Sequence, residues 1–105
     1  IGFGSGSTAY LALEAIADRI KRENLEILAI PTSSEITLAC NAHGIPTATL
    51  LDYRPDWCFD GADEVDPAGN MIKGRGAAFY REKLLINAAP KTYILADRSK
   101  LVDKL

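Results

Sequence analysis

Gly4-Ser5-Gly6-Ser7-Thr8 separates a short apolar segment, residues 1–3, from a long amphipathic pattern, residues 8–23. A strand, a small polar loop and a helix in this order are typical of α/β proteins, where such loops hold anionic ligands. Apolar residues recur in the pattern at helical spacing and predict one buried helix face: Ala9, Leu13, Ile16, Ala17 and Ile20. The stretch therefore indicates both a fold class and the sheet edge where a ligand binds.

The rest of the chain alternates strand and helix patterns. Asn24 is expected to cap the first helix in the left-handed conformation, and Ser33 or Ser34 to cap the second. Residues 66–70 form a turn joining Val65 to the pair Met71 and Ile72. Helices are also predicted at residues 35–43 and 76–89, and strands at residues 25–30, 47–51, 56–59 and 92–96. This order predicts an α/β fold with an open, mostly parallel Rossmann-like sheet and helices on both faces.

Polar clusters follow four of these strands, at residues 5–8, 32–34, 60–63 and 97–100. In a parallel sheet the carboxyl ends of all strands meet at one edge, and open α/β sheets bind their ligands there. One polar loop would carry little weight, but four at one edge predict a site.

The composition fits one globular domain. The 105 residues are 48% hydrophobic and 25% charged, with a net charge of −2, which argues against a nucleic-acid partner. No apolar run approaches the roughly 18–20 residues of a membrane helix. Cys40 and Cys58 are expected to be buried, reduced thiols of a cytoplasmic protein, with a plastid form left open. Because the chain starts without Met, we expect residues 1–105 to be a Rossmann-like catalytic domain cut from a longer chain.

The glycine-rich loop does not match the common nucleotide motifs. A dinucleotide fingerprint would need glycine where Ser7 stands, and no acidic residue follows residues 25–30 to bind a ribose. The Gly-Lys-Ser/Thr of a P-loop is also missing. Phosphate binding at the helix N-terminus and a plain strand-to-helix turn both remain open.

Two further clusters carry ionisable groups. Asp60 and Asp63 lie three residues apart, so repulsion between their charges can raise the pKa of one of them and make it a usable acid. Two other interpretations of this segment stay open: a turn stabilised by Asx hydrogen bonds, and a loop that binds a divalent metal, which is the less favoured of the two. Lys73-Gly74-Arg75-Gly76 places two cations before a helix, where they could stabilise an oxyanion or lie in a solvated turn.

Glu82 falls on the apolar stripe formed by Ala78, Leu85, Ile86 and Ala89. A carboxylate facing the interior is desolvated, which raises its pKa towards that of a base useful near neutral pH. The same test selects Arg81 on the adjacent stripe, so an exposed glutamate remains an alternative. His43, the single histidine, lies at a helix C-terminus away from the polar edge, and we expect no catalytic role for it.

The motifs, taken in order, resemble type A ribose-5-phosphate isomerase across essentially all 105 residues. They are Gly-Ser-Gly-Ser-Thr, Thr-Ser-Ser-x-x-Thr (32–37), Asp-Gly-Ala-Asp-Glu (60–64), Lys-Gly-x-Gly-Ala-x-x-x-Arg-Glu-Lys (73–83) and Ala-Asp-x-Ser-Lys (96–100). The resemblance implies interconversion of ribose 5-phosphate and ribulose 5-phosphate without metal or cofactor. It also implies a homodimer or homotetramer, and a full chain that adds a small α+β domain absent from these residues.

The resemblance further implies roles for individual residues. Glu82 is the proton acceptor, with Asp60, Asp63 and Lys73 as the other catalytic groups. The substrate-binding residues are Ser5, Gly6, Ser7, Thr8, Asp60, Gly61, Ala62, Asp63, Lys73, Gly74, Arg75, Gly76 and Lys100. Ser5 stands where threonine is frequent, and Arg75 where glycine is frequent. The alternatives are a non-catalytic sugar-phosphate sensor, an amino-sugar-phosphate isomerase or deaminase, and a coenzyme A transferase.

Overall fold

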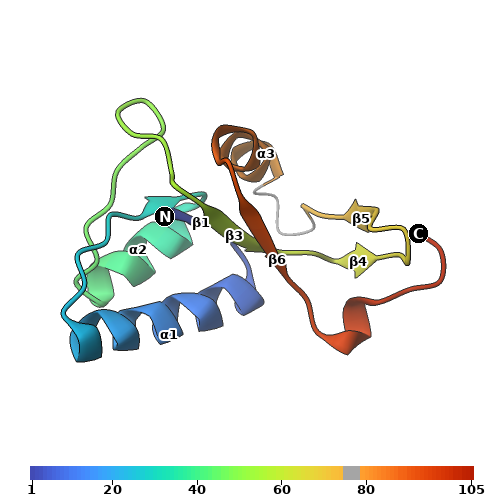
Figure 1. Cartoon of the computed structure of the whole chain (residues 1–105), viewed down its shortest axis with the longest axis horizontal. Coiled ribbons are helices and arrows are strands. Elements are labelled where there is room, and N and C mark those ends of the chain that lie inside the picture. Colours follow the sequence, from blue (N-terminus) through green and yellow to red (C-terminus); the bar gives the residue numbers. More distant parts are fainter. Residues whose placement is uncertain (75–78) are drawn as a thin grey trace.

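Four parallel strands in the order β2-β1-β3-β6 form the central sheet, and a separate antiparallel pair, β4-β5, extends from it (Figure 1). The structure is a computed structural model that describes residues 1–74 and 79–105. The helices are α1 (Ser7–Glu23), α2 (Ser34–Ala42), α3 (Phe79–Ala88) and the 3-10 helix η1 (Arg98–Lys100). The strands are β1 (Gly2–Phe3), β2 (Ile30–Pro31), β3 (Cys58–Gly61), β4 (Glu64–Val65), β5 (Met71–Ile72) and β6 (Thr92–Leu95).

Helices cover both faces of the sheet. Helices α1 and α2 lie on one face and α3 on the other (Figure 1). Phe3 and Phe59 point to the α1 side, where they join Leu13 in the larger core cluster. Cys58 points to the opposite side and packs with Leu85 of α3. This alternation follows from the period of two along a strand, and it confirms the predicted α/β class.

The sheet reverses its winding direction between β1 and β3. The chain leaves β1 through α1 to β2 on one side, and then returns to place β3 on the other side of β1. In open α/β sheets a ligand crevice forms at such a reversal, beside the carboxyl ends of the two strands. The loops after β1 and β3 are therefore the first places to look for a site.

The helical predictions agree closely with the structure. Helix α1 starts one residue before the predicted segment 8–23, and Asn24 ends it with φ 52° and ψ 49°, in the left-handed region. Ser33 caps α2, its Oγ accepting a hydrogen bond of 3.2 Å from the Ile36 N–H. The start of the predicted helix 76–89 lies outside the described residues, and its described part ends at Ala88.

The strand predictions were less accurate. The predicted strand 25–30 is reduced to β2, since its neighbour β1 offers only two residues for pairing. The predicted strand 47–51 was wrong: Thr47 forms a single bridge with Ala29, and the chain then turns away. The predicted strand 56–59 is shifted, because the longer β6 continues the ladder through Gly61. Asp60 therefore lies inside a strand rather than in the loop after it.

The predicted turn at residues 66–70 closes the β4-β5 hairpin. Asp66 Oδ1 accepts hydrogen bonds from the Ala68 and Asn70 N–H groups at 3.0 and 2.8 Å. The Asn70 side-chain amide donates a further hydrogen bond of 3.1 Å to Asp66 Oδ2, and this bond, followed by the two backbone bonds, holds the pKa of Asp66 below its ordinary value. These contacts identify Asp66 as a turn residue. Within residues 1–74 and 79–105, no helix has the length and apolar character needed to cross a membrane.

Candidate active site

Side-chain alternation brings Asp60 to the face of the sheet that α3 covers. Cys58, two residues earlier in β3, packs there against Leu85, and Glu82 lies almost one helical turn before Leu85. Gly2 pairs with Cys58, so Gly4 stands next to Asp60 in the same way. Asp60 and Glu82 thus meet at the carboxyl edge of the sheet, one step beyond the apolar contact between Cys58 and Leu85.

Gly4 is required by this arrangement. A Cβ atom at position 4 would lie 2.2 Å from Asp60 Oδ1 and 2.6 Å from the Phe59 carbonyl oxygen. Both distances are far inside van der Waals contact, so any side chain here would displace the carboxylate. The first glycine of the loop therefore makes room for Asp60.

Asp60 is buried and paired with Lys73. Its Oδ1 accepts a hydrogen bond of 2.8 Å from the Gly61 N–H, and its Oδ2 lies 3.1 Å from Lys73 Nζ. Lys73 also donates to the Gly61 carbonyl oxygen, which ties the end of the β4-β5 hairpin to β3. The side chains of Asp60 and Lys73 are 2% and 10% exposed, so each charge depends on the other for compensation.

Glu82 is 6% exposed and lies among these charges. Burial raises its pKa from an ordinary 4.5 to about 7; repulsion from Asp60 adds to the rise and attraction to Lys73 opposes it. Among the described residues, Oε1 of the ionised carboxylate has no hydrogen-bond partner, and a hydrogen bond with Asp60 favours the protonated form of Glu82. A carboxyl group with a pKa near 7 can both accept and return a proton at neutral pH. Its interior-facing position confirms the orientation predicted from the apolar stripe.

The loop between β1 and α1 forms the opposite wall. Gly6 caps α1 with φ 99°, a conformation that favours glycine, and no side chain caps this helix end. The first N–H groups of α1 therefore lack a side-chain acceptor from the cap, and the helix dipole favours an anion beside them. Ser5 lies within 2.6 Å of Thr32, oxygen to oxygen, and the Thr32 hydroxyl donates to the Phe3 carbonyl at 3.0 Å.

These elements enclose a polar pocket of about 110 Å³. Its lining contains twelve of the residues predicted as site residues: Ser5, Gly6, Ser7, Thr8, Asp60, Gly61, Ala62, Asp63, Lys73, Gly74, Glu82 and Lys100. Arg75 and Gly76, also predicted, lie outside the described residues. The pocket brings together side chains from five separate segments. Their roles in binding or catalysis stay predictions.

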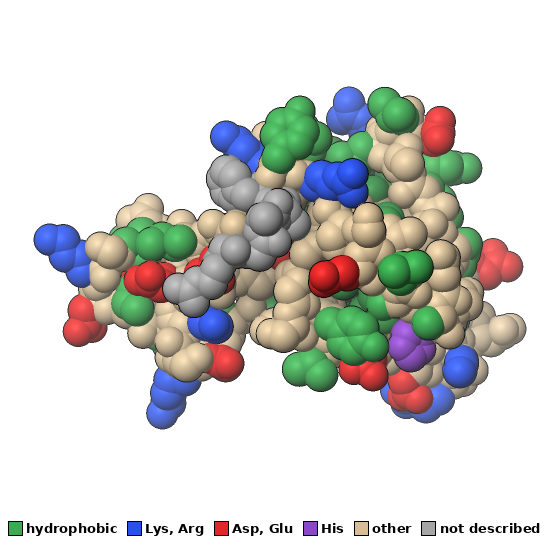
Figure 2. Space-filling view, turned by 180° about the vertical axis from the view of Figure 1, so that it is seen from behind, with side chains coloured by type: hydrophobic (Ala, Val, Ile, Leu, Met, Phe, Trp, Pro, Cys, Tyr) green, Lys and Arg blue, Asp and Glu red, His purple; other side chains and the backbone are tan. Residues whose placement is uncertain are grey.

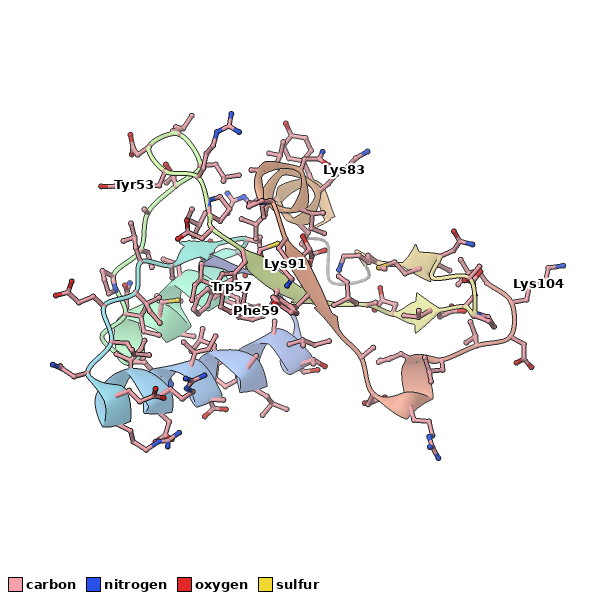
Figure 3. All side chains as sticks on the ribbon, in the orientation of Figure 1. Tyr53, Trp57, Phe59, Lys83, Lys91 and Lys104 are labelled. Carbon is pink, nitrogen blue, oxygen red and sulfur yellow. The ribbon has the colours of Figure 1, made fainter. Side chains whose placement is uncertain are left out.

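Other polar residues considered in the sequence lie elsewhere. His43 ends α2, and Arg81 is exposed on α3. Lys83 extends into solvent from α3 (Figure 3). On the face in Figure 2, acidic and basic side chains are interspersed and form no patch of one sign.

A larger hollow of about 460 Å³ lies between α1 and the strands β3 and β6. Trp57, Phe59 and Tyr93 line it, with Lys91 at 5.1 Å from the centre of the Tyr93 ring. Figure 3 shows Trp57 and Phe59 on the side of the sheet that faces α1. The larger hollow contains neither the carboxylate pair nor the glycine-rich loop, so the predicted site residues belong to the smaller pocket.

The carboxylates of the pocket do not form a metal-binding cluster with other described side chains. In residues 1–74 and 79–105, no group of three or more His, Cys, Asp or Glu side chains is placed to hold a metal ion. Asp66, which the sequence placed in a possible metal loop, instead closes the hairpin turn.

Two residues of the site were missed by the sequence interpretation. Gly4 was treated only as part of a small polar loop, but its neighbour in space is Asp60. Thr32 was recognised as polar at a strand end, but not as a support of the loop after β1. The position of Thr32 directly after β2, the strand that pairs with β1, was the available signal.

The fold and the site define an α/β protein with a glycine-rich loop at a helix N-terminus, a buried ion pair and a carboxyl group of raised pKa at the switch point of a parallel sheet. Residues 28–105 match the family model of ribose 5-phosphate isomerase A (phosphoriboisomerase A). The chain belongs to this family.

Individual proteins to which the chain is similar belong to the same family. The chain is 45% identical over 105 residues to ribose-5-phosphate isomerase A of Archaeoglobus fulgidus, covering 100% of this chain and 47% of that protein. It is 48% identical over 106 residues to the Synechocystis protein of the same name, covering 99% and 45%. The solved ribose 5-phosphate isomerase A of Methanocaldococcus jannaschii superposes with a TM-score of 0.95 at 41% identity, over 99% of this chain and 47% of that chain. The chain thus spans about half the length of these relatives.

Proposed function

We propose that the protein containing this chain interconverts D-ribose 5-phosphate and D-ribulose 5-phosphate through an enediolate, a step of the non-oxidative pentose phosphate pathway. The observation that carries the proposal is Glu82, a buried carboxyl group with a pKa of about 7 in one pocket with an anion-binding loop. A solved D-ribose-5-phosphate isomerase in complex with phospho-erythronic acid, with a TM-score of 0.94 and 42% identity to this chain, supports a phosphorylated sugar ligand.

The proton transfers can be assigned to these residues. Glu82 removes the proton from C2 of the open-chain aldose, and the C2–H electrons form the C1=C2 bond of the enediolate. Glu82 returns the proton to C1, while a hydroxyl proton moves between O2 and O1. Lys73 stabilises the oxygen that becomes negative, and Asp60 or Asp63 moves protons on the hydroxyls and assists ring opening.

The rest of the pocket holds the substrate. Ser7, Thr8 and the N–H groups that begin α1 bind the phosphate, with Lys100 as a further cation. Binding energy gained at the phosphate then orients C1 and C2 against Glu82. Neither a metal nor a nicotinamide is part of the proposal, and assembly into a dimer or tetramer belongs to the full-length protein.

The test is ribulose 5-phosphate formation by the full-length protein, with residues 1–105 assayed beside it. Turnover of ribose 5-phosphate supports the proposal. Binding without turnover would indicate a sensor, and turnover of amino-sugar phosphates or coenzyme A esters in its place would indicate one of the other enzyme classes.

A further inference from the structure

Ser5 and Thr32 form a hydrogen-bond chain whose favoured direction is set by the Phe3 carbonyl oxygen at its end. Thr32 Oγ1 lies 3.0 Å from the Phe3 carbonyl oxygen, which can only accept, so the Thr32 proton belongs to that bond. Ser5 Oγ lies 2.6 Å from the same Thr32 oxygen. Because a hydroxyl carries one proton, the bond between the two side chains must be donated by Ser5.

Reversing this chain would be unfavourable. Thr32 is 2% exposed, so water cannot readily replace a lost partner. If Ser5 turned its proton to a ligand, two oxygen lone pairs would face each other across 2.6 Å. If Thr32 turned its proton to Ser5, the Phe3 carbonyl would lose the hydrogen bond from the Thr32 hydroxyl.

We propose that Thr32 is a positioning residue. Because its oxygen accepts the hydrogen bond from Ser5, the Ser5 proton is not available to a ligand, and the Ser5 oxygen can only accept a hydrogen bond from a group in the pocket. An acceptor binds a group that carries a proton, such as a sugar hydroxyl, and it repels a phosphate dianion. Ser5 therefore recognises a hydroxyl of the substrate, and the N–H groups at the start of α1 take the phosphate. The identity of the sugar in this assignment rests on the proposed function, whereas the direction of the hydrogen bond between Ser5 and Thr32 does not.

The test compares variants of the full-length protein against two ligands, ribose 5-phosphate and inorganic phosphate. Thr32→Val removes the hydroxyl at nearly constant shape, and Thr32→Ser retains it. Thr37→Val is the matched control, because the Thr37 hydroxyl also donates to a backbone carbonyl, that of Ser33 at 2.9 Å, but lies within α2. The quantities to measure are kcat and KM for ribose 5-phosphate and the Kd of each ligand.

Thr32→Val should raise KM for ribose 5-phosphate about three- to tenfold, the effect of one hydrogen bond, and leave the Kd of inorganic phosphate nearly unchanged. Thr32→Ser and Thr37→Val should behave as wild type. Adding Thr32→Val to Ser5→Ala should raise KM no further, since Thr32 acts through Ser5.

If Thr32→Val weakened the binding of ribose 5-phosphate and of inorganic phosphate equally, the proposal would be overturned. It would also be overturned if the effects of Thr32→Val and Ser5→Ala on KM multiplied in the double variant. Should Thr32→Val not fold, Ser5→Ala decides alone, because a loss of inorganic phosphate binding there would make Ser5 a phosphate donor. If the wild-type protein binds ribose 5-phosphate without converting it, the proposed function fails. The role of Thr32 can then still be tested by comparing the Kd values of ribose 5-phosphate and inorganic phosphate between wild type and Thr32→Val.

Discussion

Glu82→Gln should make the protein more stable at alkaline pH while removing its turnover. In the folded protein the pKa of Glu82 is raised from 4.5 to about 7, so between these values the folded state keeps a proton that the unfolded state has lost. The free energy of unfolding therefore falls as pH rises through this window. At about 1.36 kcal/mol for each tenfold change in the ionisation constant, the full loss is roughly 3 kcal/mol.

Gln cannot ionise, so the variant lacks this decline. The two proteins should differ little below about pH 4, and the variant should be more stable by roughly 3 kcal/mol above about pH 8. The assay is urea unfolding of the full-length proteins at a series of pH values. Glu14→Gln, an exposed residue on α1, is the matched control for loss of one negative charge. Parallel stability curves for Glu82→Gln and wild type would refute the reasoning, because they would mean that Glu82 ionises normally in the folded state.

Kinetics of the same variant test the chemical role. In wild type, kcat/KM for ribose 5-phosphate should increase with pH around an apparent pKa of about 7, as Glu82 becomes a base. The variant should keep ribose 5-phosphate binding and lose more than about tenfold in kcat, which corresponds to ~1.4 kcal/mol. A smaller loss would assign the base to another residue.

Four other changes follow from the geometry. Gly4→Ala should lower kcat more than about tenfold by displacing Asp60, whose Oδ1 would lie 2.2 Å from the new Cβ; a crystal structure with Asp60 unmoved would contradict this. Lys73→Met should cost about 3–5 kcal/mol in urea unfolding and move the kcat/KM profile to higher pH, because Lys73 compensates Asp60 and lowers the pKa of Glu82. An unshifted profile would separate Lys73 from Glu82. Ser7→Asp should raise KM for ribose 5-phosphate with little change in melting temperature, and an unchanged KM would place the phosphate elsewhere. Activity should survive exhaustive chelation and ignore added NAD; loss in EDTA with recovery in Mg²⁺ would reinstate a metal site at residues 60–66.

The helices could be predicted from sequence because their signals are local. The apolar spacing of residues 8–23 and the cap at Asn24 are properties of the segment itself, and the structure reproduces both. The strands depend on partners that are distant in the chain. Residues 25–30 have the composition of a buried strand, but the short β1 pairs with only one of them, Ile30, and with Pro31 just beyond the segment.

The same distinction applies to the site. Asp60, Lys73 and Glu82 could be selected in advance, because ionisable groups beside apolar runs are visible in the sequence. Their mutual contacts could not, since these depend on the register of β1 against β3 and on the face of the sheet that α3 covers. Thr32 was overlooked for this reason: its significance comes from a hydrogen bond to Phe3, 29 residues away.

Under the proposed function, the charges in the pocket constrain where the phosphate of the substrate can bind. The opposite charges of Asp60 and Lys73 compensate each other, so the net charge of these three side chains depends on whether Glu82 holds a proton. Negative charge placed beside Glu82 would raise its pKa further and prevent it from acting as a base at neutral pH. We therefore expect the phosphate of the proposed substrate to be neutralised elsewhere, by the N–H groups that begin α1 and by the ammonium of Lys100. Under the proposed function the sheet separates two tasks: the loop after β1 binds the anion, and the side chains facing α3 keep the pKa of Glu82 in the range where it can exchange its proton.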